Sequence, residues 1–251
     1  MKNSKIKDFF VKVLEEIFVD KYNCIVCDDE LREKSVYGLC PKCKAKLNFI
    51  GKNICKKCGR LQLDEADYCL TCQQHKRNFE FARSSVVYDD VAKELVRGIK
   101  FGGKKYFAKY IANFLVEKYT EAFEGVNIDV VVPVPLTKKT KVNRGFNQSW
   151  EIAKRFADAV ALSADDGILA KIKDTQEQAK LGGKEREENT IGAFEVKNPQ
   201  AVENKSILVV DDVMTTGSTA SEIAKTLKAA KAKEVYVLTF ASTKFKIEEQ
   251  T

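Results

Sequence analysis

Residues 206–219 read Ser-Ile-Leu-Val-Val-Asp-Asp-Val-Met-Thr-Thr-Gly-Ser-Thr. The apolar run Ile207–Val210 is typical of a buried parallel strand, and a helical pattern runs from about Gly217 to Ala230. Two carboxylates, Asp211 and Asp212, stand where this strand is expected to end. The stretch therefore predicts a strand, a tight loop of phosphate size, and a helix.

The residue types of this loop suit a sugar phosphate. Gly217 lets the backbone approach a ligand closely, and the first amides of the following helix favour an anion. Four hydroxyl side chains add donors there: Thr215, Thr216, Ser218 and Thr219. Asp211 and Asp212 would repel a phosphate but can accept hydrogen bonds from vicinal hydroxyls or bind a hard cation such as Mg2+. A ribose 5-phosphate satisfies all of these groups together.

The same stretch resembles the phosphoribosyl pyrophosphate (PRPP) motif of the type I phosphoribosyltransferases. It lacks both the P-loop pattern and Gly-x-Gly-x-x-Gly. Further strands are expected at Phe79–Tyr88, Asp129–Val132, Ile168–Ile172, Phe194–Val196 and Glu234–Phe240, and helices after Asp89, up to about Phe123, and at Phe146–Val160. This alternation predicts an α/β fold with a parallel sheet flanked by helices, of the type I phosphoribosyltransferase kind.

Length, charge and cysteine positions narrow the class of protein to which the chain can belong. The chain has 251 residues, a net charge of +7 and a pI of about 8.8, which is compatible with anionic partners but also with a solvated lysine-rich surface. Its apolar runs are shorter than the 18 residues or more that a transmembrane helix needs. All eight cysteines precede residue 73, so they are expected to belong to one module.

The cysteines form two quartets of Cys-x2-Cys pairs. This spacing is typical of structural zinc sites, in which four thiolates close a tetrahedral shell. We expect two structural Zn2+ ions, with pairing inside each quartet, although an interleaved arrangement stays open. A module this small should need its metal to fold. The expected ligands are Cys24, Cys27, Cys40 and Cys43, and Cys55, Cys58, Cys69 and Cys72.

Three domains are expected: an amphipathic helix at 1–20, a double zinc ribbon at 21–75, and a phosphoribosyltransferase-like domain at 79–245. Charged residues interrupt the apolar stripe of the first helix, so the pattern is not that of a secretory leader. His75, the only histidine, is expected to be exposed to solvent.

Three basic or polar segments could complete an anion site. Residues 136–146 are expected to form a loop carrying Lys138, Lys139, Lys141 and Arg144, which suits a diphosphate. Lys100, Lys104 and Lys105 flank two glycines and could form a flexible basic hood. Residues 173–193 form a long polar stretch that could close over a ligand.

Taken together, the motifs are similar to those of the ComF family, which combines a double zinc ribbon with a phosphoribosyltransferase-like domain. The matching segments are both cysteine quartets, Lys100–Lys104, Val132–Pro135, Arg144–Gln148, Thr175-x-x-Gln178, Glu185–Asn189, Gly192–Phe194 and Val209–Thr219. The resemblance implies that Asp211 and Asp212 bind the ribose hydroxyls of Mg2+-bound PRPP. It also implies that 215–219 bind the 5-phosphate, 136–144 face the diphosphate, and Gln178 and Arg186 belong to a closing segment.

The resemblance further implies a role in DNA uptake during natural competence, with single-stranded DNA and other competence proteins as candidate partners. We expect a cytoplasmic location, and a peripheral position at the inner membrane face stays open. Two alternatives remain at this point. One is a salvage phosphoribosyltransferase that acts on a base or an amine, and the other is a non-catalytic zinc-ribbon scaffold.

Overall fold

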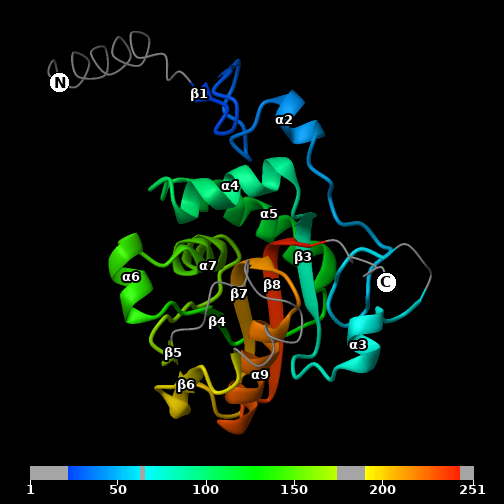
Figure 1. Cartoon of the computed structure of the whole chain (residues 1–251), viewed down its shortest axis with the longest axis vertical. Helices are drawn as coiled ribbons and strands as arrows, with labels where there is room; N and C mark the ends of the chain where they lie inside the picture. Colours follow the sequence, from blue (N-terminus) through cyan, green and yellow to red (C-terminus); the bar gives the residue numbers. More distant parts are fainter. Residues whose placement is uncertain (1–21, 63–65, 174–189, 244–251) are drawn as a thin grey trace, which may run out of the picture.

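A four-stranded parallel sheet forms the centre of the molecule. The computed structural model describes residues 22–62, 66–173 and 190–243. The strands lie in the order β3-β8-β7-β4, and every neighbouring pair is parallel (Figure 1). Their bounds are Ala82–Val87 (β3), Glu234–Ser242 (β8), Ser206–Met214 (β7) and Val130–Pro133 (β4). The expected parallel sheet is confirmed.

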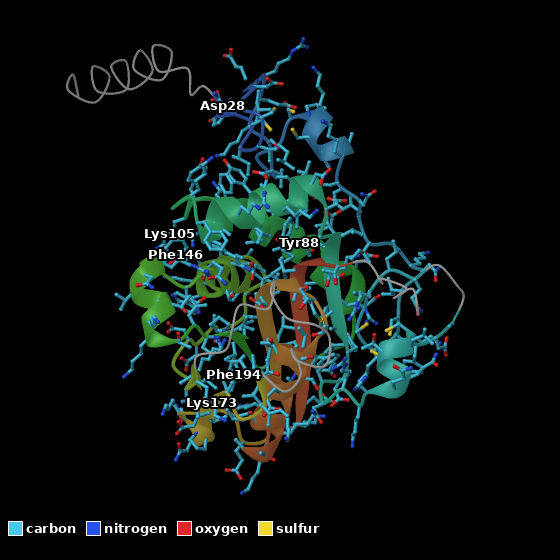
Figure 2. All side chains as sticks on the ribbon, in the orientation of Figure 1. Asp28, Tyr88, Lys105, Phe146, Lys173 and Phe194 are labelled. Atoms are coloured by element: carbon cyan, nitrogen blue, oxygen red, sulfur yellow. The ribbon has the colours of Figure 1, made fainter. Side chains whose placement is uncertain are left out.

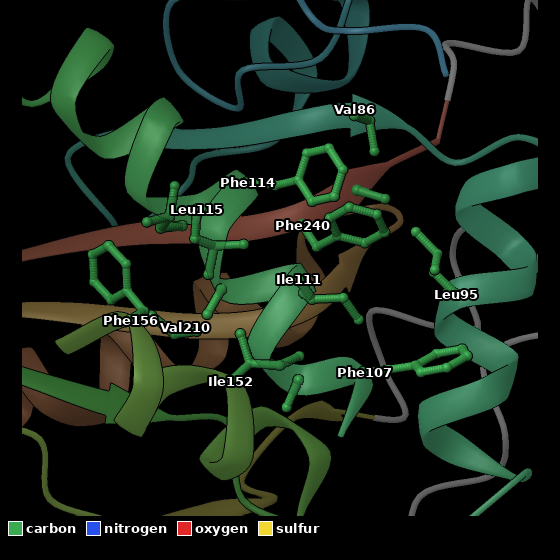
Figure 3. Packing of buried hydrophobic residues seen from close by; sticks show 14 of the residues in the cluster. Val86, Leu95, Phe107, Ile111, Phe114, Leu115, Ile152, Phe156, Val210 and Phe240 are labelled. Carbon is green, nitrogen blue, oxygen red and sulfur yellow. The ribbon is translucent and has the colours of Figure 1, made fainter. Parts of the chain in front are cut away.

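Helices cover both faces of this sheet. One face packs against α5 (Phe107–Ala122) and α7 (Gln148–Ala159), with α4 (Asp90–Lys100) joining the same apolar cluster. The other face packs against α9 (Ser218–Ala229). Because side chains alternate along a strand, Leu208 and Val210 of β7 enter the first cluster, and Ile207 and Val209 enter the second. Figure 3 shows the first cluster, in which Phe114 of α5 lies against Phe240 of β8, and Ile152 and Phe156 of α7 belong to the same cluster.

Strand β7 is longer than the sequence indicated. It continues through both aspartates to Met214, because β8 also extends to Ser242 and pairs with it, Asp211 lying opposite Thr239. The two carboxylates therefore belong to the carboxyl-terminal part of the strand, as expected, but the strand ends two residues beyond them. The loop shortens to Thr215–Gly217, and α9 begins at Ser218.

The expected loop at 136–146 contains a helix, α6 (Lys138–Arg144). Thr137 caps its start, since its Oγ1 accepts the Thr140 N–H at 3.3 Å. Gly145 ends it with a left-handed φ of 81°. A hydroxyl residue before the segment and a glycine after it are standard helix boundaries, so the sequence did contain this signal.

Two short strands stand apart from the main sheet. Strands β5 (Leu169–Lys171) and β6 (Phe194–Val196) pair antiparallel as a separate ribbon. Figure 2 labels Lys173 and Phe194 close to this ribbon. Gln178 and Arg186, from the stretch between the two strands, lie outside the described residues, as does the helix expected at 1–20.

The first cysteine quartet packs on the face of the sheet that α4, α5 and α7 cover. Its local elements are β1 (Tyr22–Asn23), β2 (Glu30–Leu31) and α2 (Pro41–Ala45). Three of its cysteines join the cluster formed with α4 and α5. Tyr37 stacks on Phe114 of α5 with 4.2 Å between ring centroids. Side-chain packing therefore attaches this quartet to the main body.

The second quartet, with α3 (Leu70–Gln74), packs with the opposite face of the sheet. Here the main chain makes the connection, because the Ala82 N–H of β3 donates to the Lys57 carbonyl at 2.8 Å. Gly59 has a φ of 68°, and a Cβ there would lie 2.2 Å from the Ala82 carbonyl oxygen. Only glycine fits this close approach. The proposed domain boundaries at residues 75 and 79 stay a prediction.

Candidate functional site

The eight cysteines form two compact clusters. In each quartet the four sulfur atoms lie within 4.8 Å of one another, so pairing within quartets is confirmed. The Sγ–Sγ distance is 3.7 Å for both Cys27–Cys40 and Cys58–Cys69. A tetrahedral Zn2+ with Zn–S bonds of about 2.3 Å would place its sulfurs about 3.8 Å apart. Both clusters thus fit a closed, structural zinc site.

The surroundings of the cysteines also fit metal binding. The Cys43 N–H points at Cys40 Sγ at 3.4 Å, and the Cys58 N–H points at Cys55 Sγ at 3.5 Å, as suits thiolates. His75 is half-buried, which corrects the expectation of a solvent-exposed side chain, and it belongs to neither cluster.

A pair of carboxylates lies at the carboxyl end of β7. Asp212 is buried, with 2% of its surface exposed, and its Oδ2 lies 2.5 Å from the Lys100 ammonium at the end of α4. Asp211 Oδ1 accepts two hydrogen bonds, from Ser149 Oγ at 2.7 Å and from the Asp212 amide at 2.9 Å. The two acids are therefore held by different partners.

Because Asp211 and Asp212 have different partners, their pKa values differ. Burial and the neighbouring Asp212 charge raise the pKa of Asp211 to about 8, although Lys100 and Ser149 oppose the shift. Burial also acts on Asp212, but the Lys100 ammonium and hydrogen bonds outweigh it, and the pKa of Asp212 is lowered. The pKa of Lys100 is raised, because the two carboxylates outweigh its desolvation. Near neutral pH the cluster thus holds an Asp212–Lys100 ion pair beside Asp211, whose pKa of about 8 lies close to that pH.

The segment from α6 to α7 supports this pair. Arg144 donates to Gln148 Oε1, and Gln148 is in turn a hydrogen-bond partner of the Asp212 carboxylate. Asn147 fixes the start of α7, since its Nδ2 donates to the Val134 carbonyl at 3.0 Å and its Oδ1 accepts the Ser149 N–H at 3.0 Å. The ends of β4 and β7 are thereby tied together at one edge of the sheet.

The loop after β7 has the geometry of an anion site. Gly217 adopts a left-handed φ of 79° immediately before α9, which places the first amides of a 12-residue helix at the sheet edge. The Thr216 and Ser218 hydroxyls lie 2.8 Å apart at this helix start. Thr243 secures the loop from β8 by donating its N–H to the Met214 carbonyl at 3.2 Å. Chemically, this edge offers acceptors for hydroxyls beside donors for a phosphate.

Comparisons with known proteins agree with this geometry. Residues 15–73 match the double zinc ribbon domain, and residues 107–250, more than half of the chain, match the phosphoribosyl transferase domain. The chain belongs to the phosphoribosyl transferase family, in its ComF branch with a double zinc ribbon.

Curated relatives support the ComF assignment over most of their length. A Salmonella typhimurium protein named DNA utilization protein YhgH is 29% identical over 196 residues, covering 77% of this chain and 85% of the relative. The Bacillus subtilis competence protein ComFC is 28% identical, covering 83% and 90%. The Haemophilus influenzae competence protein F is 24% identical, covering 86% and 95%.

Within this ComF chain, the residues predicted for the site are partly brought together. Asp211, Asp212 and the stretch 215–219 lie at one sheet edge, where α6 also follows β4. Arg144 contacts Gln148, whereas Lys138 and Lys139 are exposed on α6.

Sequence reasoning missed two contacts of the carboxylate pair and misread two lysines that it expected in a flexible hood. Ser149 and Gln148 bind the acid pair, and only their position after the Arg144-Gly-Phe-Asn run could have indicated them. Lys100 is an internal ion-pair partner and not part of a free hood. Lys105 is also paired, with Glu151 at 2.7 Å.

A separate cavity of about 490 Å³ lies between the first cysteine quartet and the start of α5. Tyrosines and lysines line much of it, among them Tyr22, Lys34, Lys104, Tyr106 and Tyr110. It does not include the carboxylate pair. Within the described part of the chain, no helix is long and apolar enough to cross a membrane.

Proposed function

We propose that this ComF protein binds PRPP with Mg2+ at the carboxyl edge of its parallel sheet. The observation that carries the proposal is the juxtaposition of two unequal carboxylates with a glycine-bounded loop and the start of α9. Open parallel sheets bind ligands at this edge. The family membership supports the same ligand class.

Each part of the proposed site has a chemical task. The carboxylates of Asp211 and Asp212 accept the ribose hydroxyls, and the amides and hydroxyls of 215–219 hold the 5-phosphate. Lys138, Lys139 and Arg144 on α6 attract the diphosphate, with Gln178 and Arg186 from the segment outside the described residues completing the enclosure. Displacement of diphosphate at ribose C1 would then depend on positioning and on charge stabilisation.

The carboxylate oxygens of this site could bind Mg2+, but not all of them are free to do so. Carboxylate oxygens are suitable ligands for a hard cation, but one oxygen of Asp212 is already occupied by Lys100. We therefore assign Mg2+ chiefly to the diphosphate of the ligand, where it would supply charge neutralisation. Asp211, the acid without an ammonium partner, is the protein group that could add a ligand once it is ionised.

The biological role we propose is the handling of DNA during natural competence. The support comes from relatives named for competence and for DNA utilization. In this proposal, two structural zinc ions hold the cysteine clusters, and single-stranded DNA is a partner. A gel-shift series tests that partner: binding should weaken steeply as salt rises, and no shift at low salt would remove DNA from the proposal.

Calorimetry with PRPP and Mg2+ tests the ligand assignment. Asp211→Ala and Asp212→Ala should each weaken binding about 10- to 100-fold, the usual effect of losing hydrogen bonds to a charged group. Asp158→Ala is the matched control, because this exposed carboxylate lies on α7 away from the pair. Wild-type affinity in both test variants, with folding verified by circular dichroism, would refute the assignment.

A further inference from the structure

The two cysteine quartets differ in how far solvent can reach their sulfurs. Among the eight cysteines, all of which lie in the described part of the chain, only Cys27 is exposed, and it belongs to neither apolar cluster. Cys72 of the second quartet is half-buried and packs against the cluster on its face of the sheet. Asp28, the residue after Cys27, lies at the outer end of the molecule, away from the sheet (Figure 2). A reagent in solution can therefore approach the first quartet through one sulfur.

Two arginines lie beside the second quartet. Arg83 is half-buried, and its Nη1 donates at 3.1 Å to the carbonyl of Lys56, a residue between Cys55 and Cys58. Its charge interacts with both of those sulfurs. Arg60 is 6% exposed, and its Nε has no hydrogen-bond partner among the described residues. A buried cation needs an opposite charge nearby, and four thiolates around one Zn2+ keep a net negative charge. The two guanidinium groups thus compensate the charge of the second shell.

The exposed sulfur of the first quartet has acidic neighbours instead. Asp28 and Asp29 follow Cys27 directly, and both are exposed. Lys34 and Lys104 line the neighbouring cavity, but both are exposed, so solvent and salt screen their charge. When a thiolate attacks a neutral electrophile, negative charge leaves the sulfur, and a fixed cation nearby slows that attack. The first quartet is thus both more accessible and more reactive than the second.

We infer that Cys27 is an oxidation site through which hydrogen peroxide opens the first zinc shell while the second shell stays closed. The inference goes beyond the binding of PRPP and DNA, and it rests on one part of the proposed function, the two structural zinc ions. It assigns different roles to two sites that have the same ligands and the same spacing.

The chemistry needs only the two sulfurs and the peroxide. Cys27 Sγ attacks one peroxide oxygen, the O–O bond breaks, a sulfenic acid forms, and the other oxygen leaves as water. Cys40 Sγ, 3.7 Å away, then attacks the oxidised sulfur, so an S–S bond replaces the S–O bond and a second water leaves. Two thiolates give up two electrons, the peroxide takes them, and two protons come from solvent. The shell loses two of its four ligands, and its metal is released.

Opening the first shell would free one face of α5. Tyr37 stacks on Phe114 of α5, and its hydroxyl donates to Glu117 on the same helix. In return, the Asn113 side chain donates to the Val36 carbonyl. Residues 24–43 need the metal to fold, so they keep these contacts only while the shell is closed. Oxidation should therefore loosen the contact between 24–43 and α5 and leave the second quartet attached to β3.

Zinc release from the full chain under hydrogen peroxide tests the inference. A chromogenic chelator records the released zinc, and alkylation followed by mass spectrometry records which thiols have been consumed. One of the two ions should leave at least about tenfold faster than the other, with Cys27 as the first thiol lost. Hydrogen exchange in residues 107–122 should rise together with the first release.

Arg83→Gln tests the charge difference between the quartets. Glutamine keeps a donor for the Lys56 carbonyl but removes the positive charge, so release from the second quartet should become about 3- to 30-fold faster. Release from the first quartet should not change. Arg97→Gln is the matched control, because its pair with Glu94 on α4 is exposed, and it should leave both rates unchanged.

Metal analysis before treatment separates this inference from the zinc assignment on which it rests. Two ions in the untreated protein, followed by equal release rates or by loss of a thiol in 55–72 before Cys27, overturn the inference alone. Release from the first quartet with Cys27 still reduced also overturns it. An untreated protein without zinc overturns the zinc assignment and the inference together.

Discussion

The cysteine clusters and the carboxylate pair both bring acidic side chains close together, but they differ in the partners of those side chains. Each cysteine quartet brings four equivalent sulfurs within 4.8 Å, the arrangement of a closed metal shell. The carboxylate pair is unequal: Asp212 has an ammonium partner, and Asp211 has hydroxyl and amide donors. A closed shell leaves no position for a ligand, whereas unequal partners leave one acid available.

We infer from this difference that the cysteine clusters stabilise the fold and that the carboxylate pair takes part in binding. The thiols lie in apolar clusters that extend the core on each face of the sheet, so their loss should affect folding. The carboxylates lie at the sheet edge next to a loop that can hold an anion, so changes there should affect binding. The predictions below test this division.

The largest effect is expected from breaking a cysteine shell. Cys58→Ser removes a fully buried ligand of the second cysteine quartet. It should lower the free energy of unfolding by at least about 4 kcal/mol in chemical denaturation. Metal analysis should fall from about two zinc ions per chain to about one. Cys27→Ser, at an exposed position of the other cluster, should lose one ion with a smaller loss of stability. Two retained ions and wild-type stability in Cys58→Ser would show that the cluster is not a metal shell.

A smaller loss of stability is expected from removing the ammonium at the acid pair. Lys100→Met leaves Asp212 buried without its counter-charge, which should destabilise the fold by about 3 kcal/mol. Adding Asp212→Asn should recover part of this, with a coupling free energy of at least about 1 kcal/mol. Lys93→Met is the control on the same helix, because its pair with Asp90 is exposed and should contribute less than about 0.5 kcal/mol. Strict additivity of the Lys100 and Asp212 changes would contradict the ion pair.

The smallest effect is expected from Asp211→Asn, which should be more stable than the wild type at high pH only. The folded-state pKa of Asp211 lies above its ordinary value, so the folded chain retains this proton after the unfolded chain has lost it. Wild-type stability is therefore reduced progressively as the pH rises from about 4 to about 8. Asp211→Asn should remove that penalty and raise the free energy of unfolding by about 1 kcal/mol or more at pH 9, with almost no gain at pH 4.

The same variant should bind PRPP more weakly at both pH values. Urea denaturation at pH 4 and pH 9 provides the stability readout. A gain that is equal at the two pH values, or a loss at pH 9, would contradict the burial of an ionised Asp211.

Much of this fold was predictable because its signals are local. The apolar run Ile207–Val210, the helix at Phe146–Val160 and the Cys-x2-Cys spacings depend on periodicity or on fixed geometry. The extension of β7 past the aspartates could not be predicted from local sequence, because it depends on pairing with β8. Helix α6 had a threonine cap and a terminal glycine, but its basic composition favoured the interpretation as a diphosphate loop.

The site was predicted only where its residues are contiguous. Residues 211–219 predict a ribose-phosphate ligand by themselves, whereas Ser149, Gln148 and Lys100 reach the carboxylates from two other helices. Such contacts are set by tertiary packing and leave no periodic pattern. The exposure of Cys27 belongs to the same class, since the Cys-x2-Cys spacing does not distinguish one ligand from another.

Hydrogen–deuterium exchange with and without PRPP and Mg2+ tests the central claim most directly, because it reports where the ligand binds. The account predicts added protection in peptides that cover 211–219 and 144–149, and little change in peptides that cover 24–43 and 55–72. Protection confined to the cysteine segments, or no protection at a PRPP concentration that saturates the calorimetric signal, would contradict it.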